Sequence, residues 1–363
     1  METLVTIKDK SYRIRQFFFR WGISLPGLAA QIIFGWFPLI IAVLVSFQTF
    51  HFRQSTWCGL DNYKSVFSDP TTSPFSVKMA KENYALSIKS YKETNVLDPN
   101  PVLKACYGFR AFFNGLGLVW RNTLYYAFLV LALTFFIPIL VAILLMEMPP
   151  WLIRIMMLMW FVPIAGMASI ILLKYFYNVD YGLLNGLLAK FYTFIGKPTA
   201  EWVFPRYLNS PDSAMLCLVL PNLIMYVPGL IYITALQGIP QDLYDAAEID
   251  GCNFFQKIWN VTLPRLRPVI VTMLIFVVLG AFQVMNEVMI MTQGGPGNAT
   301  MVMGYYIYKL SFEYLDLGRA NALAVVFFLF LMVLTILQRI YIKEDTDHGV
   351  SKKTLKLMDE DLF

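Results

Sequence analysis

The sequence has few charged residues. Asp, Glu, Lys and Arg together make up 15% of its 363 residues, against about 25% in an average soluble domain. Hydrophobic residues make up 58%, against about 45–50%. So much apolar side chain is incompatible with a disordered chain and leaves more apolar surface than a water-soluble enzyme can cover. The composition therefore favours helices embedded in lipid.

The residues that most metal and redox sites need are scarce. Of the two histidines, His51 and His348, neither has a nearby partner at metal-ligand spacing. The four cysteines are far apart and form no C-x-x-C pair, so neither a zinc motif nor a redox motif is present. We therefore expect no metal and no cofactor. The net charge of +5 does not indicate a nucleic-acid partner, because the basic residues flank apolar runs instead of alternating with aromatics.

Six long runs without a charged side chain stand out instead. A helix needs roughly 20 apolar residues to cross the bilayer core. The runs are residues 21–52, 122–146, 155–173, 213–241, 268–286 and 320–338, and the fifth continues without charge from Glu287 to 308. The first is longer than the roughly 7–15-residue core of a signal peptide, so we expect an uncleaved anchor. The sequence thus predicts an all-α integral membrane protein with six spans.

Basic residues gather at both ends of the chain. The residues before the first run are Lys8, Lys10, Arg13, Arg15 and Arg20, and those after the last are Arg339, Lys343, Lys352, Lys353 and Lys356. The positive-inside rule then puts both termini in the cytoplasm. We expect a cytoplasmic segment 1–20, a membrane domain 21–342 and a cytoplasmic tail 343–363. The loop 238–267 would be cytoplasmic, and 53–121, 174–212 and 292–319 would lie outside.

The predicted cytoplasmic loop 238–267 has the pattern of two short amphipathic helices around a glycine. Pro240 suits the first turn of the first helix, and Gly251 can adopt the left-handed conformation that ends it. Phe254, Phe255, Ile258 and Trp259 form an apolar stripe at helical spacing, and we expect Pro264 to stop the second helix. Such a loop suits docking into the groove of a partner, or a position on the lipid surface.

Within this loop, Asp245-Ala246-Ala247 is followed by three residues and Gly251, and nine more residues lead to Val261-Thr262-Leu263-Pro264. This spacing resembles the EAA loop of ABC-importer permeases. Asp replaces the family's Glu, and Val replaces its Ile. Gly59–Tyr63, Trp120–Thr123 and Met291–Thr300 are similar to segments of the maltose-type sugar permeases. The segment 73–113 looks like an insertion relative to that branch.

The resemblance implies a six-helix transmembrane domain of a type I, binding-protein-dependent importer in the bacterial plasma membrane, with an extracytoplasmic insertion between its first two helices. It also implies a carbohydrate substrate and three kinds of partner: a second permease subunit in a heterodimer, two ABC ATPase subunits and an extracytoplasmic solute-binding protein. No G-x-x-x-x-G-K-[ST] motif is present, so ATP hydrolysis belongs to another subunit and the chain is no enzyme. The residues expected to couple to the ATPase are Tyr244, Asp245, Ala246, Ala247, Asp250, Gly251, Leu263 and Pro264.

Candidate substrate residues lie on the fourth and fifth spans. Gln283, Asn286 and Glu287 have the spacing of one helix face, and an ionisable group within a span usually faces a cavity or a partner. Asn222, Tyr226 and Tyr232 of the fourth span would complete the pocket. Three alternatives remain: interhelical hydrogen bonding, a helix break near Glu287 that places it in an outer vestibule, and tyrosines that anchor at the membrane interface.

Other functions fit the sequence less well. A permease for another solute, such as glycerol phosphate, should have several Arg or Lys residues facing the cavity, and the spans have none at their midplanes, which favours neutral or acidic sugars. An ion-coupled secondary transporter could use Glu287, but it would not need a docking loop. A membrane enzyme would need clustered His, Asp or Ser near the spans, and the sequence has no such cluster.

Overall fold

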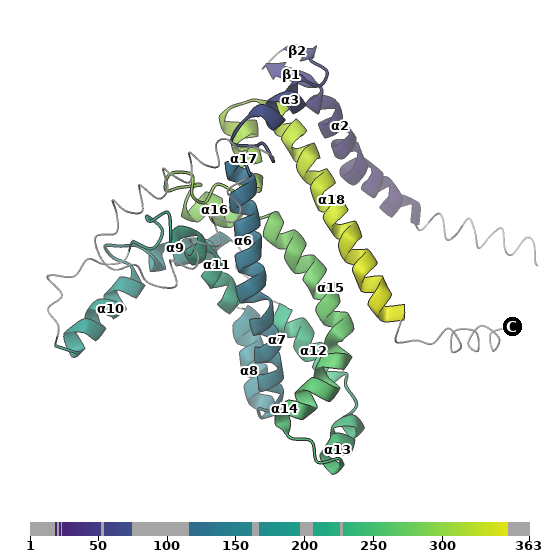
Figure 1. The fold of residues 1–363 in the computed structure, drawn as a ribbon, viewed down its shortest axis with the longest axis vertical. Helices are drawn as coiled ribbons and strands as arrows, with labels where there is room; N and C mark the ends of the chain where they lie inside the picture. Colours follow the sequence, from purple (N-terminus) through teal and green to yellow (C-terminus); the bar gives the residue numbers. More distant parts are fainter. Residues whose placement is uncertain are drawn as a thin grey trace, which may run out of the picture. The chain divides into compact units, whose positions relative to one another are not determined.

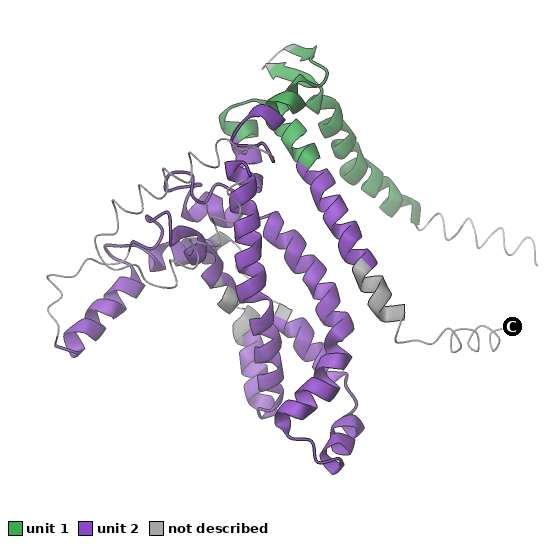
Figure 2. Cartoon of the chain, viewed as in Figure 1, with its two compact units in different colours: residues 1–66, 310–326 green, residues 67–309, 327–363 purple. Residues whose placement is uncertain are grey.

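The computed structural model describes residues 24–51, 54–74, 116–161, 167–196, 206–225 and 228–347, together with positions 19 and 22. The described chain is mainly helical, as the composition predicts (Figure 1). It divides into two compact units, one within residues 1–66 and 310–326 and the other within 67–309 and 327–363 (Figure 2). Almost all of the expected insertion 73–113 lies outside the described residues.

The first unit contains an apolar helix from Ser24 to Ser46 that leads into a β-hairpin. Its elements are η1 (Ile32–Trp36), α2 (Phe37–Ser46), β1 (Gln48–His51), β2 (Gln54–Trp57), the start of α3 (Asp61–Ser68) and most of η5 (Lys309–Glu313). The strands are antiparallel, with Thr49 opposite Thr56. The first span was therefore predicted too long, because an uncharged stretch rich in Thr and Phe also suits a strand. The hairpin is the one departure from an all-α fold among the described residues.

The second unit is a bundle of helices around α6. Its elements are α6 (Leu118–Thr134), α7 (Phe136–Met146), α8 (Pro150–Phe161), α9 (Met167–Phe176), α10 (Leu183–Phe194), α11 (Ala214–Met225), α12 (Pro228–Gln237), α13 (Gln241–Ile249), α14 (Phe254–Lys257), η4 (Ile258–Thr262), α15 (Leu263–Phe282), α16 (Asn286–Met291) and α17 (Met303–Tyr308). The long helix α18 (Leu317–Asp347) begins in the first unit and ends in the second. Helix α6 packs against α11, α15 and α17, and α12 packs against α7 and α15.

Four of the predicted spans coincide with long apolar helical segments. These helices are Ser24–Ser46, Leu118–Met146, Phe254–Met291 and Leu317–Ile340, and each is long and apolar enough to cross a membrane. The third predicted span falls on α8 and α9, and the fourth on α11 and α12. The short junction within each of these pairs lies outside the described residues. The mainly helical fold is thus confirmed, and the described helices are consistent with six spans.

Candidate functional site

The first limb of the loop 238–267 is α13, which ends at a glycine as predicted. Gly251 has φ of 78°, in the left-handed region. Its N–H donates to the Glu248 carbonyl at 3.0 Å, and the Cys252 N–H donates to the Ala247 carbonyl at 2.9 Å. These two bonds form a Schellman motif, which satisfies carbonyls at the helix end. Pro240 occupies the N-cap of α13, one position before the first turn.

The second limb is longer than predicted. It starts with a capping box in which the Asn253 side chain accepts from the Gln256 N–H at 2.9 Å and the Gln256 side chain accepts from the Asn253 N–H at 2.8 Å. From there α14, η4 and α15 follow one another without a break. The expectation that Pro264 stops this helix is wrong. Pro264 lies in the first turn of α15, directly after a π-turn whose bonds already depart from the α-helical pattern, so its missing N–H is tolerated.

Two side-chain contacts join the limbs. The hydroxyl oxygens of Tyr244 and the buried Thr262 are 3.1 Å apart, and Lys257 Nζ is 2.9 Å from Glu248 Oε2. We call these two contacts the loop clasp. Sequence analysis missed Glu248 and Lys257, because nine positions across a turn match no helical spacing. Together they hold α13 against the start of the long helix.

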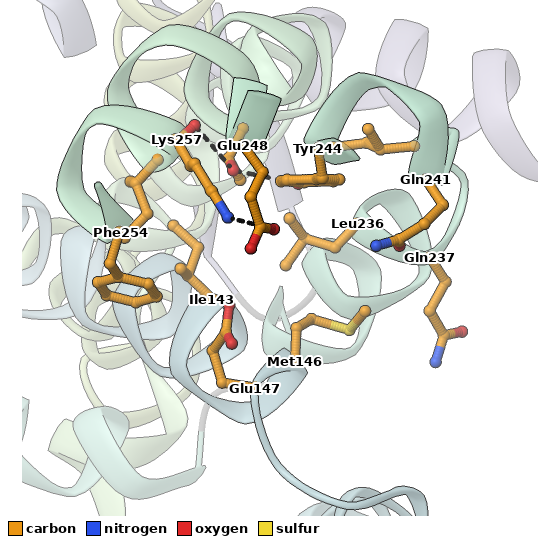
Figure 3. A pocket seen from close by; sticks show the side chains of 13 residues that line it. Ile143, Met146, Glu147, Leu236, Gln237, Gln241, Tyr244, Glu248, Phe254 and Lys257 are labelled. Carbon is orange, nitrogen blue, oxygen red and sulfur yellow. Dashed lines mark hydrogen bonds and ion pairs between the residues drawn. The ribbon is translucent and has the colours of Figure 1, made fainter. Parts of the chain in front are cut away.

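A cavity of about 460 Å³ lies between the loop clasp and the ends of α7 and α12 (Figure 3). Its apolar wall includes Ile143, Leu236 and Ile258, and its polar lining includes Glu147 as well as the residues of the clasp. The cavity therefore separates part of the loop from α7 and α12. The contacts of the loop clasp help to hold the loop in its conformation.

Three large apolar side chains are exposed on the loop, among exposed polar ones. The side chains of Ile249, Phe255 and Trp259 are 87%, 78% and 73% exposed. Phe254, which is also exposed, and Ile258, from the same predicted stripe, line the cavity. The predicted coupling residues are divided in the same way: Asp245, Ala246, Asp250, Gly251 and Pro264 are exposed, Tyr244 and Leu263 are half-buried, and Ala247 is buried. Only part of the predicted set can therefore touch a partner, while the rest shape the loop.

A central cavity of about 440 Å³, between α6, α11 and the end of α15, brings together most of the predicted substrate residues. Asn222, Gln283, Asn286 and Glu287 all line it. The sequence-based prediction required the fourth and fifth spans to lie side by side here. The structure confirms that these four residues line one cavity.

The remaining tyrosines behave differently from the prediction. Tyr226 lies outside the described residues, and Tyr232 is 1% exposed and is not part of the cavity lining. Tyr126 of α6 lines the cavity, and its hydroxyl accepts a hydrogen bond from Asn222 Nδ2 at 3.3 Å. Sequence analysis missed Tyr126, since no spacing relates a residue of the second span to one of the fourth.

The helix that leads to Glu287 is interrupted at the cavity. Helix α15 ends at Phe282, residues 283–285 are not helical, and α16 starts at Asn286. The expectation of one continuous helix face is therefore wrong, because the helix breaks near Glu287, while the position of Glu287 in an outer vestibule stays a prediction. At this point Gly304 of α17 comes so close that a Cβ there would lie 2.8 Å from the Val284 carbonyl oxygen. The neighbouring helix thus packs directly against the irregular backbone.

The segment after α16 is fixed to the start of α6. The buried Asn122 Nδ2 donates to the carbonyls of Asn298 at 2.9 Å and Met301 at 3.1 Å. The Met303 N–H donates to Thr123 Oγ1 at 2.8 Å. Two of the segments that carry the sugar-permease resemblance are therefore in contact. Their shared role in the described structure is to fix the chain beyond the central cavity.

Comparison with known proteins gives related chains and solved structures. The permease protein AraP of an arabinooligosaccharide transport system in Halalkalibacterium halodurans is 27% identical over 321 residues, which is 86% of this chain and 84% of the relative. The sulfoquinovosyl glycerol permease SmoG of Agrobacterium fabrum is 34% identical over 188 residues, 51% of this chain and 58% of the relative. The trehalose/maltose permease MalF of Thermococcus litoralis is 34% identical over 172 residues, 46% and 53% respectively. The chain thus spans little more than half the length of the last two relatives.

A solved structure shares the fold. It is a bacterial ABC transporter involved in the import of the acidic polysaccharide alginate, and it matches with a TM-score of 0.68 and 17% identity over 93% of this chain and 99% of that chain. The family model described as the inner membrane component of binding-protein-dependent transport systems matches residues 115–344, well over half of the chain. This range includes the loop 238–267 and all residues that line the central cavity. The chain therefore belongs to the inner membrane components of binding-protein-dependent transport systems, as its loop motif predicts.

Proposed function

We propose that the chain forms one half of the transmembrane pathway of an ABC importer for a carbohydrate, an oligosaccharide or sugar derivative. Its partners would be a second permease subunit, two ATPase subunits and an extracytoplasmic solute-binding protein. The sugar substrates in the names of the relatives support the substrate class. A related alginate transporter structure is a complex with a pentasaccharide-bound periplasmic protein, which supports the last of these partners.

The observation that carries the proposal is the chemistry of the central cavity. Its volume falls in the range of about 300–1,000 Å³ that is usual for small-molecule sites. The amides of Asn222, Gln283 and Asn286 can donate to and accept from sugar hydroxyls, and Glu287 can accept from them. No Lys or Arg is among the described residues that line it. The lining therefore suits a neutral sugar better than a phosphate ester, which needs cations.

The loop 238–267, which we call the coupling loop, would connect the central cavity to ATP hydrolysis. In this scheme both termini are cytoplasmic, and the exposed residues Asp245, Ala246 and Asp250 contact the ATPase together with the apolar Ile249 and Trp259. Closure of the ATPase pair then moves α13 and, through the loop clasp, the helix that begins at α14. Because that helix reaches the central cavity, the movement alternates access to the substrate.

An ion-coupled carrier is the second candidate, because Glu287 lines the central cavity and an ionisable group there could bind a proton or cation. The exposed apolar surface of the coupling loop argues against it, since a carrier without subunits has no use for such a surface.

The test is transport by the complete complex in liposomes. The assembled permease pair, ATPases and binding protein are supplied with neutral oligosaccharides, an oligouronate or glycerol 3-phosphate, with and without ATP. We expect ATP-dependent uptake of a neutral sugar. Uptake by this chain alone without ATP would overturn the importer proposal, and preference for the phosphate ester would overturn the substrate class.

A further inference from the structure

Helix α10 has an exposed apolar face that neither the central cavity nor the coupling loop uses. Leu183, Leu187, Phe191 and Phe194 recur at intervals of three and four, so they form one stripe along the helix. Their side chains are 58%, 54%, 58% and 88% exposed. Thr193 lies beside this stripe and is also exposed. Four large apolar side chains on one face are too many to leave in water.

A rigid turn fixes the direction of α10 relative to α9. Asn178 Oδ1 accepts from the N–H groups of Asp180 at 2.9 Å and Tyr181 at 3.2 Å, and Asn185 Nδ2 donates to the Val179 carbonyl at 2.9 Å. Only glycine fits at position 182, since a Cβ there would clash with the Asn178 carbonyl oxygen. The stripe therefore keeps a defined orientation and is not part of a loose loop.

The stripe continues an apolar surface that begins on α9. Leu172, near the end of the predicted third span, and Tyr175, just beyond it, are 70% and 58% exposed. Tyr181 in the turn is 69% exposed, and its ring centroid is 6.2 Å from that of Tyr175. Exposed tyrosines of this kind gather where a membrane helix leaves the hydrocarbon and enters the headgroup region. Such tyrosines are typical of a turn at the level of the lipid headgroups.

We propose that α10 is an interfacial helix that lies in the plane of the membrane surface, with its stripe inserted among the lipids. It contains one charged residue, Lys190, whose amine can reach the headgroups. A surface for a soluble protein would be expected to have a polar rim around its apolar centre, which so short and apolar a helix does not supply. This proposal requires that the chain belongs to a membrane protein family, and it does not depend on which solute the protein transports.

The position of α10 has a consequence for the central cavity. Lys174 Nζ, at the end of α9, donates to the Ile290 carbonyl of α16 at 2.9 Å. Helix α16 also contains Glu287. An α10 held at the lipid surface would thus limit the movement of α9, and through this bond that of α16.

Spin labelling of the complete transporter in lipid nanodiscs tests the position. In a background without the four native cysteines, single cysteines replace Leu187, Phe191, Phe194 and, as the matched control, Thr193. We expect severalfold higher collision with oxygen than with a water-soluble nickel chelate at the three stripe positions, and the reverse at Thr193. Water-accessible stripe labels would overturn the proposal, and so would labels shielded from both reagents, which would indicate a protein partner such as the binding protein.

A charge introduced into the stripe of α10 tests whether its contact with lipid restrains α16. Phe191→Glu should lower the uptake rate severalfold while the complex still assembles, and Thr193→Glu should leave uptake unchanged. Unchanged uptake by an assembled Phe191→Glu complex would show that the lipid contact, even if present, does not restrain α16. Failure of the sugar-transport proposal would not affect the spin-label result, because that measurement needs no substrate.

Discussion

The two ends of the helical segment Phe254–Met291 differ in a way that its sequence does not suggest. The end in the coupling loop contains Pro264 and a π-turn, yet it remains one continuous helix. The end at the central cavity contains no proline, yet it breaks at residues 283–285. At the loop end, side chains of α13 hold the helix in place through the loop clasp. At the cavity end, Gly304 of the neighbouring helix packs against the irregular backbone, where a Cβ would lie 2.8 Å from the Val284 carbonyl oxygen.

This difference shows that the positions of proline do not predict where this helical segment is interrupted. A helix that transmits a movement should be continuous at the end that receives it, which here is the end in the coupling loop. A helix that binds a polar solute benefits from irregular backbone, provided that this backbone lines a cavity or is buried in protein. The proposed coupling and substrate functions match these two requirements in turn.

Substitution of Gly251 should give the largest effect at the loop end. Gly251→Val puts a β-branched residue at φ of 78°, which costs about 1–2 kcal/mol and destroys the Schellman motif. We expect the ATPase to be lost from a mild-detergent pull-down and ATP-driven uptake to fall to background. The matched control is Gly238→Ala, in the same loop, where the nearest atom to the added Cβ is the Ala235 carbonyl oxygen at 3.4 Å, an ordinary contact. Full recovery of the ATPase with Gly251→Val would disprove the docking role.

Substitution of Glu287 tests the cavity end. Glu287→Ala removes an acceptor whose hydrogen bonds to sugar hydroxyls are worth about 1.5–3 kcal/mol, so the uptake rate at saturating binding protein should fall roughly tenfold or more. Glu287→Gln, which keeps an acceptor, should lose less. Uptake that no longer depends on pH in Glu287→Gln, with dependence in the unchanged chain, would instead support ion coupling.

The hydroxyl contact of the loop clasp should matter less. Tyr244→Phe and Thr262→Val each remove one partner of the same contact, worth about 0.5–1.5 kcal/mol. We expect either variant to raise the ATP hydrolysed per sugar imported, and the double variant to be no worse than the poorer single one. Additive losses in this double-mutant cycle would show that the two residues act separately.

The ion pair of the loop clasp should give the smallest effect. Glu248 is 73% and Lys257 24% exposed, and such pairs contribute about 0.2–1 kcal/mol. Lys257→Met should therefore weaken coupling slightly at low ionic strength. The deficit should vanish near 1 M salt, where the Debye length is about 3 Å. A deficit that persists at high salt would mean that Lys257 acts by packing.

Local chemistry explains what the sequence could predict. Gly251 ends its helix because the preference of glycine for positive φ needs no partner elsewhere in the chain. The apolar runs mark spans because the bilayer thickness sets their length. The family resemblance, based on the spacing of the coupling loop, is confirmed by the match over residues 115–344.

Contacts between distant segments explain what the sequence could not predict. The contact of Tyr126 with Asn222, the loop clasp and the break at residues 283–285 all depend on neighbours that no local pattern reveals. The hairpin after Ser46 was missed because lack of charge does not distinguish a strand from a helix. The substrate and ATPase contacts of the candidate residues stay predictions, as does the cytoplasmic position of the termini.

The π-turn η4 has a consequence for protein engineering. A π-turn contains one residue more than an α-helical turn. The residues before Ile258 are therefore rotated about the helix axis by about 100° from where a regular α-helix ending in α15 would place them. A deletion of one residue within Ile258–Thr262 would restore the regular helix and turn Lys257 away from Glu248. A chimaera that joins the loop of one permease to the spans of another should therefore be spliced outside these five residues.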